Sequence, residues 1–282
     1  MKAESITPGA SRTRLWVPVR DGRLYVELTG DGPPLLLIHG WPLDQRIFDT
    51  QVAGLKDDLT LVRYDRRGFG RSDASPDLVQ EVADIDVLLD TLGIETTHLL
   101  GMSQGGRIAL RYAVTRPERV RSLVLQGAAV DGVSVTEDDS ERIPLEEYAN
   151  LAQEGKLSEL RQHWLRHPMM HLDSRFANEA ILVRKIVDAY FGRDLLTFSP
   201  GSFSFPVDVL ASLSNFNKPV LIITGEQESE SRRQHAAELK KRLPDCREVV
   251  LEDGGHLCNL TAVTAYNDAV REFCRAAESR TA

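Results

Sequence analysis

A Gly-x-Ser-x-Gly pattern occupies residues 101–105, with Ser103 at its centre, and residues of these types at this spacing suit nucleophilic catalysis. The apolar run 97–100 before it predicts a buried strand, and residues 107–113 after it predict a helix. A sharp turn between a strand and a helix requires very small residues two positions before and two after the serine, as in a nucleophile elbow. Such a turn exposes the hydroxyl at the helix N-terminus, where free N–H groups and the helix dipole favour a developing negative charge. The competing interpretation is an ordinary glycine-rich turn.

The segments around this motif alternate between two hydrophobic periodicities. Short apolar runs predict strands that are covered on both faces, and longer segments with apolar residues at helical spacing predict helices between them. Repeated strand–helix–strand units imply a parallel sheet with helices on both faces. The predicted strands are 14–19, 23–28, 34–39, 59–64, 98–102, 121–126, 219–224 and 247–251, and the predicted helices of this part are 46–55, 76–92, 104–115, 230–242 and 261–276.

The alternation stops between residues 132 and 206. The sequence there predicts no strand, only helical pieces over 144–153, 156–167 and 175–191. We therefore expect an α/β core formed by residues 1–131 and 207–282, with a helical insertion over residues 132–206. Ligands of open α/β sheets bind beyond the carboxyl ends of the strands, so the insertion is expected to cover that region as a cap.

The composition limits the classes of partner. The 282 residues include 34 basic and 42 acidic side chains, a net charge of -8, which argues against nucleic acid or an anionic membrane as the main partner. No apolar run reaches the roughly 18 residues of a membrane span, and residues 1–12 do not resemble a secretory signal. The three cysteines lack metal-ligand spacing and are expected to be free thiols in a reducing cytoplasm. We predict a cytoplasmic protein with a small-molecule substrate, as a monomer or homodimer.

Five blocks of sequence occur in an order that is typical of one family. The blocks are His39-Gly40-Trp41-Pro42, residues 64–72, the elbow at Ser103, Gly225-Glu226-Gln227-Glu228 and Gly254-Gly255-His256. With these blocks the chain resembles the α/β-hydrolase superfamily over nearly its whole length, and within it the small bacterial esterases, enol-lactonases and cofactor-free perhydrolases. The resemblance implies an α/β-hydrolase fold with a mostly parallel eight-stranded sheet flanked by helices, a helical cap, the order nucleophile–acid–histidine and no cofactor.

The resemblance assigns a role to each residue of a catalytic triad. Ser103 is the nucleophile, and His256, in a loop after the last predicted strand, is the base that takes its proton. The acid is expected three residues after the glycine that closes the late strand, where this chain has Glu228 and the family usually has aspartate. Because glutamate is one methylene longer, its loop must sit slightly further back. We favour Glu228 and leave Glu226 and Asp131 open as alternative acids.

The resemblance also implies an oxyanion hole formed by the backbone N–H groups of Trp41 and Gln104. Three histidines in the insertion are spaced four residues apart, but Pro168 interrupts the helix between them and no carboxylate or cysteine completes a ligand set, so no metal site is predicted. Some large apolar side chains are expected to contact substrate, although packing between cap and core is the alternative role. These candidates are Trp41, Met102, Trp164, Met169 and Met170, and the three histidines are His163, His167 and His171.

Together these residues predict a cofactor-independent serine hydrolase. It would cleave a small carboxylic ester or lactone through an acyl-enzyme on Ser103, His256 and Glu228. One alternative is hydrolysis of a carbon–carbon bond in a β-diketone-type substrate by the same triad. Another is a ligand-binding signalling protein on the same fold, because a fold alone does not set function. Dehalogenases and epoxide hydrolases are disfavoured, since those relatives carry aspartate where Ser103 stands.

Overall fold

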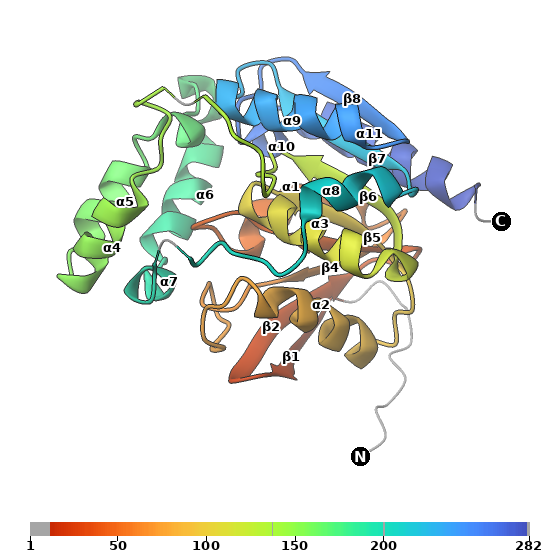
Figure 1. Cartoon of the computed structure of the whole chain (residues 1–282), viewed down its shortest axis with the longest axis horizontal. Helices are drawn as coiled ribbons and strands as arrows, with labels where there is room; N and C mark the ends of the chain where they lie inside the picture. Colours follow the sequence, from red (N-terminus) through yellow and green to blue (C-terminus); the bar gives the residue numbers. More distant parts are fainter. Residues whose placement is uncertain (1–11, 137, 200, 281–282) are drawn as a thin grey trace.

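Eight strands form one sheet in the order β1-β2-β4-β3-β5-β6-β7-β8 in the computed structural model, which describes residues 12–136, 138–199 and 201–280 (Figure 1). β1 pairs antiparallel with β2 and β2 with β4, and the other neighbours are parallel. The predicted α/β class with a mostly parallel eight-stranded sheet is confirmed. The strands are β1 (Thr13–Val19), β2 (Gly22–Thr29), β3 (Pro34–Ile38), β4 (Thr60–Tyr64), β5 (Thr97–Met102), β6 (Val120–Gln126), β7 (Val220–Gly225) and β8 (Cys246–Leu251).

The central strands bury side chains on both faces of the sheet. Leu36 and Ile38 of β3 belong to one apolar cluster with residues of several helices, whereas Leu35 and Leu37 belong to a second cluster with a different set of helices. Because successive side chains of a strand point to opposite faces, the two clusters are the two sides of the sheet. The first side is covered by α2 (Gln80–Thr91), α3 (Gln104–Thr115) and α9 (Glu230–Arg242), and the second by α1 (Asp49–Leu55) and α11 (Val263–Glu278).

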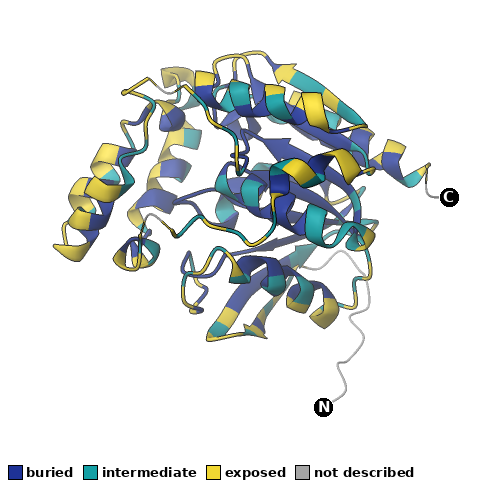
Figure 2. Ribbon diagram, in the orientation of Figure 1, coloured by how far each residue is buried: buried dark blue, intermediate teal, exposed yellow. Residues whose placement is uncertain are grey.

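The described residues between β6 and β7 contain helices and no strand. The helices α4 to α7 lie together on one side of the sheet, at the left of Figure 1. Their buried residues, such as Tyr148, Trp164 and Val187, belong to the same cluster as Leu35, while their outer sides are exposed (Figure 2). The helical segment therefore shares its apolar core with one face of the sheet. Its elements are α4 (Leu145–Gln153), α5 (Leu157–Trp164), α6 (Ala177–Asp188) and α7 (Arg193–Leu196). The helix that follows, α8 (Val209–Ser212), packs with Val209 in the other cluster.

Some helix boundaries differ from the predicted ones. The helix predicted over 76–92 begins only at Gln80, because the carboxylate of Asp77 accepts hydrogen bonds from the backbone N–H groups of Val79 and Gln80. The helix predicted over 261–276 is α11, shifted by two residues at both ends, and a short additional helix, α10 (Cys258–Thr261), precedes it. Among the described residues, no helix is both long enough and apolar enough to cross a membrane.

Candidate active site

Ser103 occupies the turn between β5 and α3 with a positive φ of 55° and ψ of -118°. A non-glycine residue in such a conformation costs on the order of 1–3 kcal/mol and persists only when its surroundings impose it. The Ser103 N–H donates to the carbonyl of Gln126 at 2.8 Å, and the Ser103 carbonyl accepts from the N–H groups of Gly106 and Arg107 at 3.0 and 3.2 Å. These bonds anchor the serine to β6 and to the first turn of α3.

The two glycines of the motif are required by close backbone contacts. A Cβ at Gly101 would lie 2.5 Å from the carbonyl oxygen of Gly105, and a Cβ at Gly105 would lie 2.1 Å from the carbonyl oxygen of Ile38. Any larger residue would push these segments apart, because real Cβ atoms do not approach backbone atoms within 3.0 Å. The sequence pattern and the geometry of the turn thus have the same steric cause.

His256 and Glu228 form a buried hydrogen-bonded pair. His256 Nδ1 lies 2.9 Å from Glu228 Oε2, and the two residues are 4% and 2% exposed. Burial alone raises the pKa of Glu228, but the charge of His256 and the hydrogen bonds from His256 and from the Ser229 N–H outweigh it and hold that pKa below its usual value. The carboxylate is therefore ionised at neutral pH, and it orients the imidazole so that Nδ1–H donates and Nε2 remains an acceptor.

The other two carboxylates considered as acids lie elsewhere. Asp131 accepts a hydrogen bond from Arg111 Nε at 2.7 Å and forms an ion pair with Arg107 Nε at 3.1 Å. Glu226 is exposed and faces a different cavity, which it shares with Arg233. Of the three carboxylates, Glu228 is the one that the structure hydrogen-bonds to His256.

The loops that carry this pair are tied to each other and to β6. Gln126, the last residue of β6, donates from Nε2 to the carbonyl of His256 at 2.9 Å and accepts from the Tyr266 hydroxyl at 2.8 Å. The N–H of Gln227 donates to the carbonyl of Gly254 at 2.7 Å, which joins the loop of Glu228 to the loop of His256. The position of the imidazole is therefore set from three sides.

The backbone at Gly127 lies directly against the pair. Gly127 has a φ of 50°, and a Cβ at this position would lie 2.7 Å from Glu228 Oε2 and 2.8 Å from His256 Nδ1. Both the backbone conformation and the lack of space call for glycine. The sequence analysis did not identify this residue, because its partners are distant in the chain.

Two backbone N–H groups lie free beside Ser103. A Cβ at Gly40 would lie 3.7 Å from Ser103 Oγ, so the backbone that leads into Trp41 passes next to the hydroxyl. Gln104 is the first residue of α3, where an N–H has no acceptor within the helix. In the described part of the chain, neither the Trp41 nor the Gln104 backbone N–H donates to another residue. An oxyanion hole at these two N–H groups stays a prediction.

A buried arginine joins the two segments that carry these donors. Arg66 forms a bidentate ion pair with Glu81 at 2.7 and 2.8 Å, and it also donates to the His39 carbonyl at 3.1 Å and to Gln104 Oε1 at 2.8 Å. His39 Nε2 accepts from the Arg66 N–H at 3.0 Å. Burial and the neighbouring Arg66 charge lower the pKa of His39 well below its usual value, so the ring is neutral. His39 thus braces the loop.

The indole of Trp41 is held by the helical segment. Its Nε1 donates to Asp194 Oδ2 at 2.8 Å and to the Tyr190 hydroxyl at 3.1 Å, and that hydroxyl donates to Asp194 Oδ1 at 2.6 Å. The ring also packs edge-on against Trp164, with centroids 4.8 Å apart. Burial raises the pKa of Asp194 although both hydrogen bonds lower it. Asp194 thereby links α7 to the loop beside Ser103, a role that no sequence pattern indicated.

A cavity of about 210 Å³ opens at Ser103. Of the predicted substrate contacts, Trp41 and Trp164 line it. Met102, Met169 and Met170 are not among its lining residues and are buried in the apolar cluster on that side of the sheet, so their contact with substrate stays a prediction. The lining residues are Trp41, Ser103, Gln104, Arg107, Ala129, Ile143, Leu145, Trp164, Phe203, Arg232 and His235.

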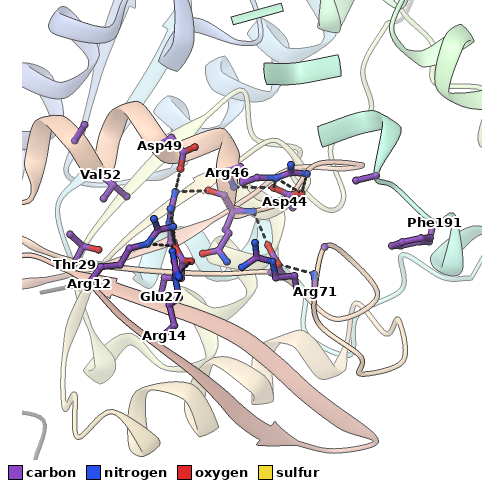
Figure 3. A pocket seen from close by; sticks show the side chains of 16 residues that line it. Arg12, Arg14, Glu27, Thr29, Asp44, Arg46, Asp49, Val52, Arg71 and Phe191 are labelled. Carbon is purple, nitrogen blue, oxygen red and sulfur yellow. Dashed lines mark hydrogen bonds and ion pairs between the residues drawn. The ribbon is translucent and has the colours of Figure 1, made fainter. Parts of the chain in front are cut away.

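A larger cavity, of about 710 Å³, does not include Ser103, His256 or Glu228 among its lining residues (Figure 3). Its charges are paired with each other, as the dashed lines in Figure 3 show. Glu27 accepts from Arg63 and Arg14, and Asp44 accepts from Arg46. A ligand would have to displace these pairs, so this cavity is a weaker candidate for a binding site.

Three polar residues of the Ser103 cavity were missed at the sequence level: Arg107, Arg232 and His235. The spacing of four residues between Ser103 and Arg107 was an available signal, because residues that far apart lie on one side of a helix. Among the described residues, no group of three His, Cys, Asp or Glu side chains could hold a metal ion. Two of the histidines in the insertion, His163 and His167, pack against the rings of Tyr148 and Trp164.

Comparison with known proteins identifies the family. The putative carbamate hydrolase RutD of Pseudomonas savastanoi pv. phaseolicola is 28% identical over 253 residues, which cover 87% of this chain and 95% of that protein. A thermophilic esterase from Thermogutta terrifontis has a similar structure, with a TM-score of 0.79, 23% identity and coverage of 95% of this chain and 99% of the esterase. The enol-lactonase of Burkholderia xenovorans LB400 has a TM-score of 0.77 at 22% identity, with coverage of 93% and 100%.

The identity with these two solved structures is low, so they establish the shared fold and not a shared substrate. The family model described as the alpha/beta hydrolase fold matches residues 33–263, which include the elbow, the acid loop and the histidine loop. The chain therefore belongs to the α/β-hydrolase family.

Proposed function

We propose that the protein is a serine hydrolase that cleaves a small carboxylic ester or lactone through a covalent acyl-enzyme. The observation that carries this proposal is the buried 2.9 Å hydrogen bond between His256 and Glu228, in a chain that presents Ser103 on a strained elbow. Esterases and an enol-lactonase among the structural relatives are consistent with it. A serine hydroxyl needs a base to become a nucleophile at neutral pH, and a base needs a partner that orients it.

In the acylation step, His256 Nε2 takes the hydroxyl proton of Ser103 while Oγ attacks the substrate carbonyl carbon. Glu228 stabilises the imidazolium that forms, through the charge-assisted bond to Nδ1. The tetrahedral oxyanion accepts hydrogen bonds from the N–H groups of Trp41 and Gln104. Collapse of the intermediate breaks the bond to the leaving oxygen, which receives the proton from His256. The product of this step is an acyl ester on Ser103.

In the deacylation step, a water molecule attacks the acyl carbon and gives its proton to His256 Nε2. The same two N–H groups stabilise the second oxyanion, and His256 returns the proton to Ser103 Oγ as the carboxylic acid leaves. Donors that are fixed before the reaction favour the transition state over the bound ester, because they need no reorganisation when charge develops. The ion pair of Arg66 with Glu81 supports this rigidity from behind both segments.

We propose that residues 132–206 act as the cap over this site. The contacts between Trp41 and Asp194, and the place of Trp164 in the wall of the Ser103 cavity, support this role. A second cavity of about 350 Å³ shares Trp41, Gln104, Leu145 and Phe203 with the first. Two adjoining spaces would suit the acyl and alcohol parts of an ester.

The test is hydrolysis of a series of short-chain p-nitrophenyl esters by the wild type and four variants. Ser103→Ala is expected to abolish turnover, and Glu228→Gln to lower kcat by about 10³- to 10⁴-fold, because the amide cannot stabilise the imidazolium or favour the same tautomer. Glu226→Gln is the matched control, an exposed glutamate two residues away. Asp131→Asn is expected to change kcat by less than about threefold on a neutral ester, because its carboxylate contacts arginines and not His256.

The activities of these variants identify the acid of the triad and test the substrate class. A full loss in Asp131→Asn with little change in Glu228→Gln would name Asp131 as the acid and refute the proposed triad. If the wild type cleaves none of the esters but a fluorophosphonate labels Ser103, the nucleophile is competent and the ester substrate class is wrong. Carbon–carbon bond hydrolysis or a ligand-binding role would then be tested next.

A further inference from the structure

The cavity at Ser103 combines apolar walls with positively charged side chains. Among its lining residues are two guanidinium groups, Arg107 and Arg232, and one imidazole, His235, but no carboxylate. A site for a wholly neutral ester would gain nothing from partly buried cations, since their desolvation is costly. The composition of the walls therefore indicates a charged part of the substrate.

Arg107 is placed to meet that part. It lies on α3 one helical turn after Ser103, so its side chain starts from the same side of the helix as the nucleophile. Its guanidinium stacks over the ring of Phe203 at 4.8 Å, and its Nε faces Asp131 at 3.1 Å. Its buried Nε has no hydrogen-bond partner within the described ranges, so the contact with Asp131 is an ion pair alone. A guanidinium held in this way presents a fork that matches a carboxylate.

The charge around Arg107 is not balanced by its nearest partner. Asp131 is shared between Arg107, 3.1 Å away, and Arg111, 2.7 Å away. In this set of three side chains, two guanidinium groups face one carboxylate. A bound anion would reduce the excess positive charge.

Two titratable groups lie among these charges. Burial and the neighbouring Arg111 and Arg232 lower the pKa of Arg107 to about 10 in spite of Asp131. Burial together with Arg232 and Arg107 lowers the pKa of His235 to about 4. Arg107 remains charged and His235 neutral at pH 7. His235 Nδ1 is buried without a hydrogen-bond partner in the described parts of the chain, which leaves a further polar group for a ligand.

We propose that this cavity selects an ester or lactone whose acyl part carries a second, free carboxylate, and that Arg107 binds that carboxylate. The inference rests on the proposed serine hydrolase function and names the substrate class for it. At about 210 Å³ the cavity is smaller than the roughly 300–1,000 Å³ typical of sites for drug-sized ligands, so the acyl part is short. A half-ester of a four-carbon dicarboxylic acid has these properties.

The experiment compares two p-nitrophenyl esters of nearly equal shape, the hemisuccinate with its free carboxylate and the levulinate with a methyl ketone in its place. After subtraction of the uncatalysed rate, the wild type is expected to have a kcat/KM about 10- to 100-fold higher for the hemisuccinate, as for one charge-assisted contact. Arg107→Gln should bring this ratio close to one, and Arg107→Lys should recover part of the ratio. Arg116→Gln, beyond the other end of α3, is the matched control and should keep the wild-type ratio.

The proposal is overturned if the wild-type ratio is at or below one, or if Arg107→Gln leaves the ratio unchanged. Turnover of the levulinate would still uphold the hydrolase function in either case. If neither ester is cleaved, the readout is protection of Ser103 from a fluorophosphonate by succinate. Protection that is lost in Arg107→Gln but kept in Arg116→Gln would support the anion site although ester hydrolysis had failed. If about 100 mM succinate does not protect the wild type, the anion site is refuted, because a dissociation constant above this concentration is weaker than the usual specific affinities.

Discussion

Substitution of Gly127 by alanine tests whether the close approach of this backbone to the His256–Glu228 pair matters for catalysis. The new Cβ would lie 2.7 Å from Glu228 Oε2 and 2.8 Å from both Cε1 and Nδ1 of His256. To reach an ordinary contact distance of 3.4 Å, the pair must move by about 0.7 Å relative to the backbone. A misplacement of roughly 1 Å at a reacting group costs about 10²-fold in rate, so we expect kcat/KM to fall by about 30- to 100-fold.

The same substitution also strains the backbone, and this effect has its own control. Gly127 has a φ of 50°, and alanine in the left-handed region costs about 1 kcal/mol in the free energy of unfolding. Gly93 and Gly155 have similar φ values of 67° and 73°, but a Cβ at either would meet nothing within 4 Å. Gly93→Ala and Gly155→Ala should therefore show the strain without the catalytic defect.

The assay is turnover of the best p-nitrophenyl ester by the three glycine variants, with the rate of fluorophosphonate labelling at Ser103 as a second readout. Thermal unfolding of each variant checks that comparisons are made on folded protein. If Gly127→Ala retains the activity and labelling rate of Gly93→Ala at equal foldedness, the His256–Glu228 pair does not depend on this contact. That result would refute the steric reasoning, and with it the view that the pair must be held in this position.

Two further predictions concern buried carboxylates. Asp194→Asn is expected to lower the free energy of unfolding by about 1–3 kcal/mol, because an amide can accept from only one of the two donors, Trp41 and Tyr190, and turns its own N–H₂ toward the other. Chemical denaturation measures this loss of stability. An equal loss in Tyr190→Phe would argue against the Asp194 carboxylate as the centre of this hydrogen-bonded group. Hydrogen bonds from its arginine partners outweigh the effect of burial and lower the pKa of Glu27 to about 2. The ionised Glu27 therefore stabilises the fold above the unfolded pKa near 4.5, and this contribution is lost as pH falls toward 2. The stability difference between wild type and Glu27→Gln, followed by thermal unfolding from pH 7 to pH 2, should therefore shrink below about pH 4.5; a constant difference would refute the linkage.

The chain's local patterns were sufficient to predict the strand–turn–helix unit around Ser103. The predicted limits of the helices α3 and α9 agree with the structure at both ends, and the predicted limits of the strands agree within one or two residues. These features depend on short-range causes, namely hydrophobic periodicity and the steric demand for glycine at positions 101 and 105. Boundaries were less accurate where a side chain ends or begins a helix, as Asp77 does before α2.

Only the tertiary structure decided which groups meet across long separations in the chain. Three carboxylates were compatible with the sequence, and the hydrogen bond from His256 to Glu228, together with the arginine contacts of Asp131, distinguishes them in space. Trp41 and Asp194 are 153 residues apart, and their contact follows from how the helical segment packs on the sheet. Met102 reads equally well as a lining or a core residue, and it becomes a core residue because its strand position turns it into the apolar cluster. Local sequence specifies backbone shape and periodicity, whereas side-chain partners depend on the packing of whole elements.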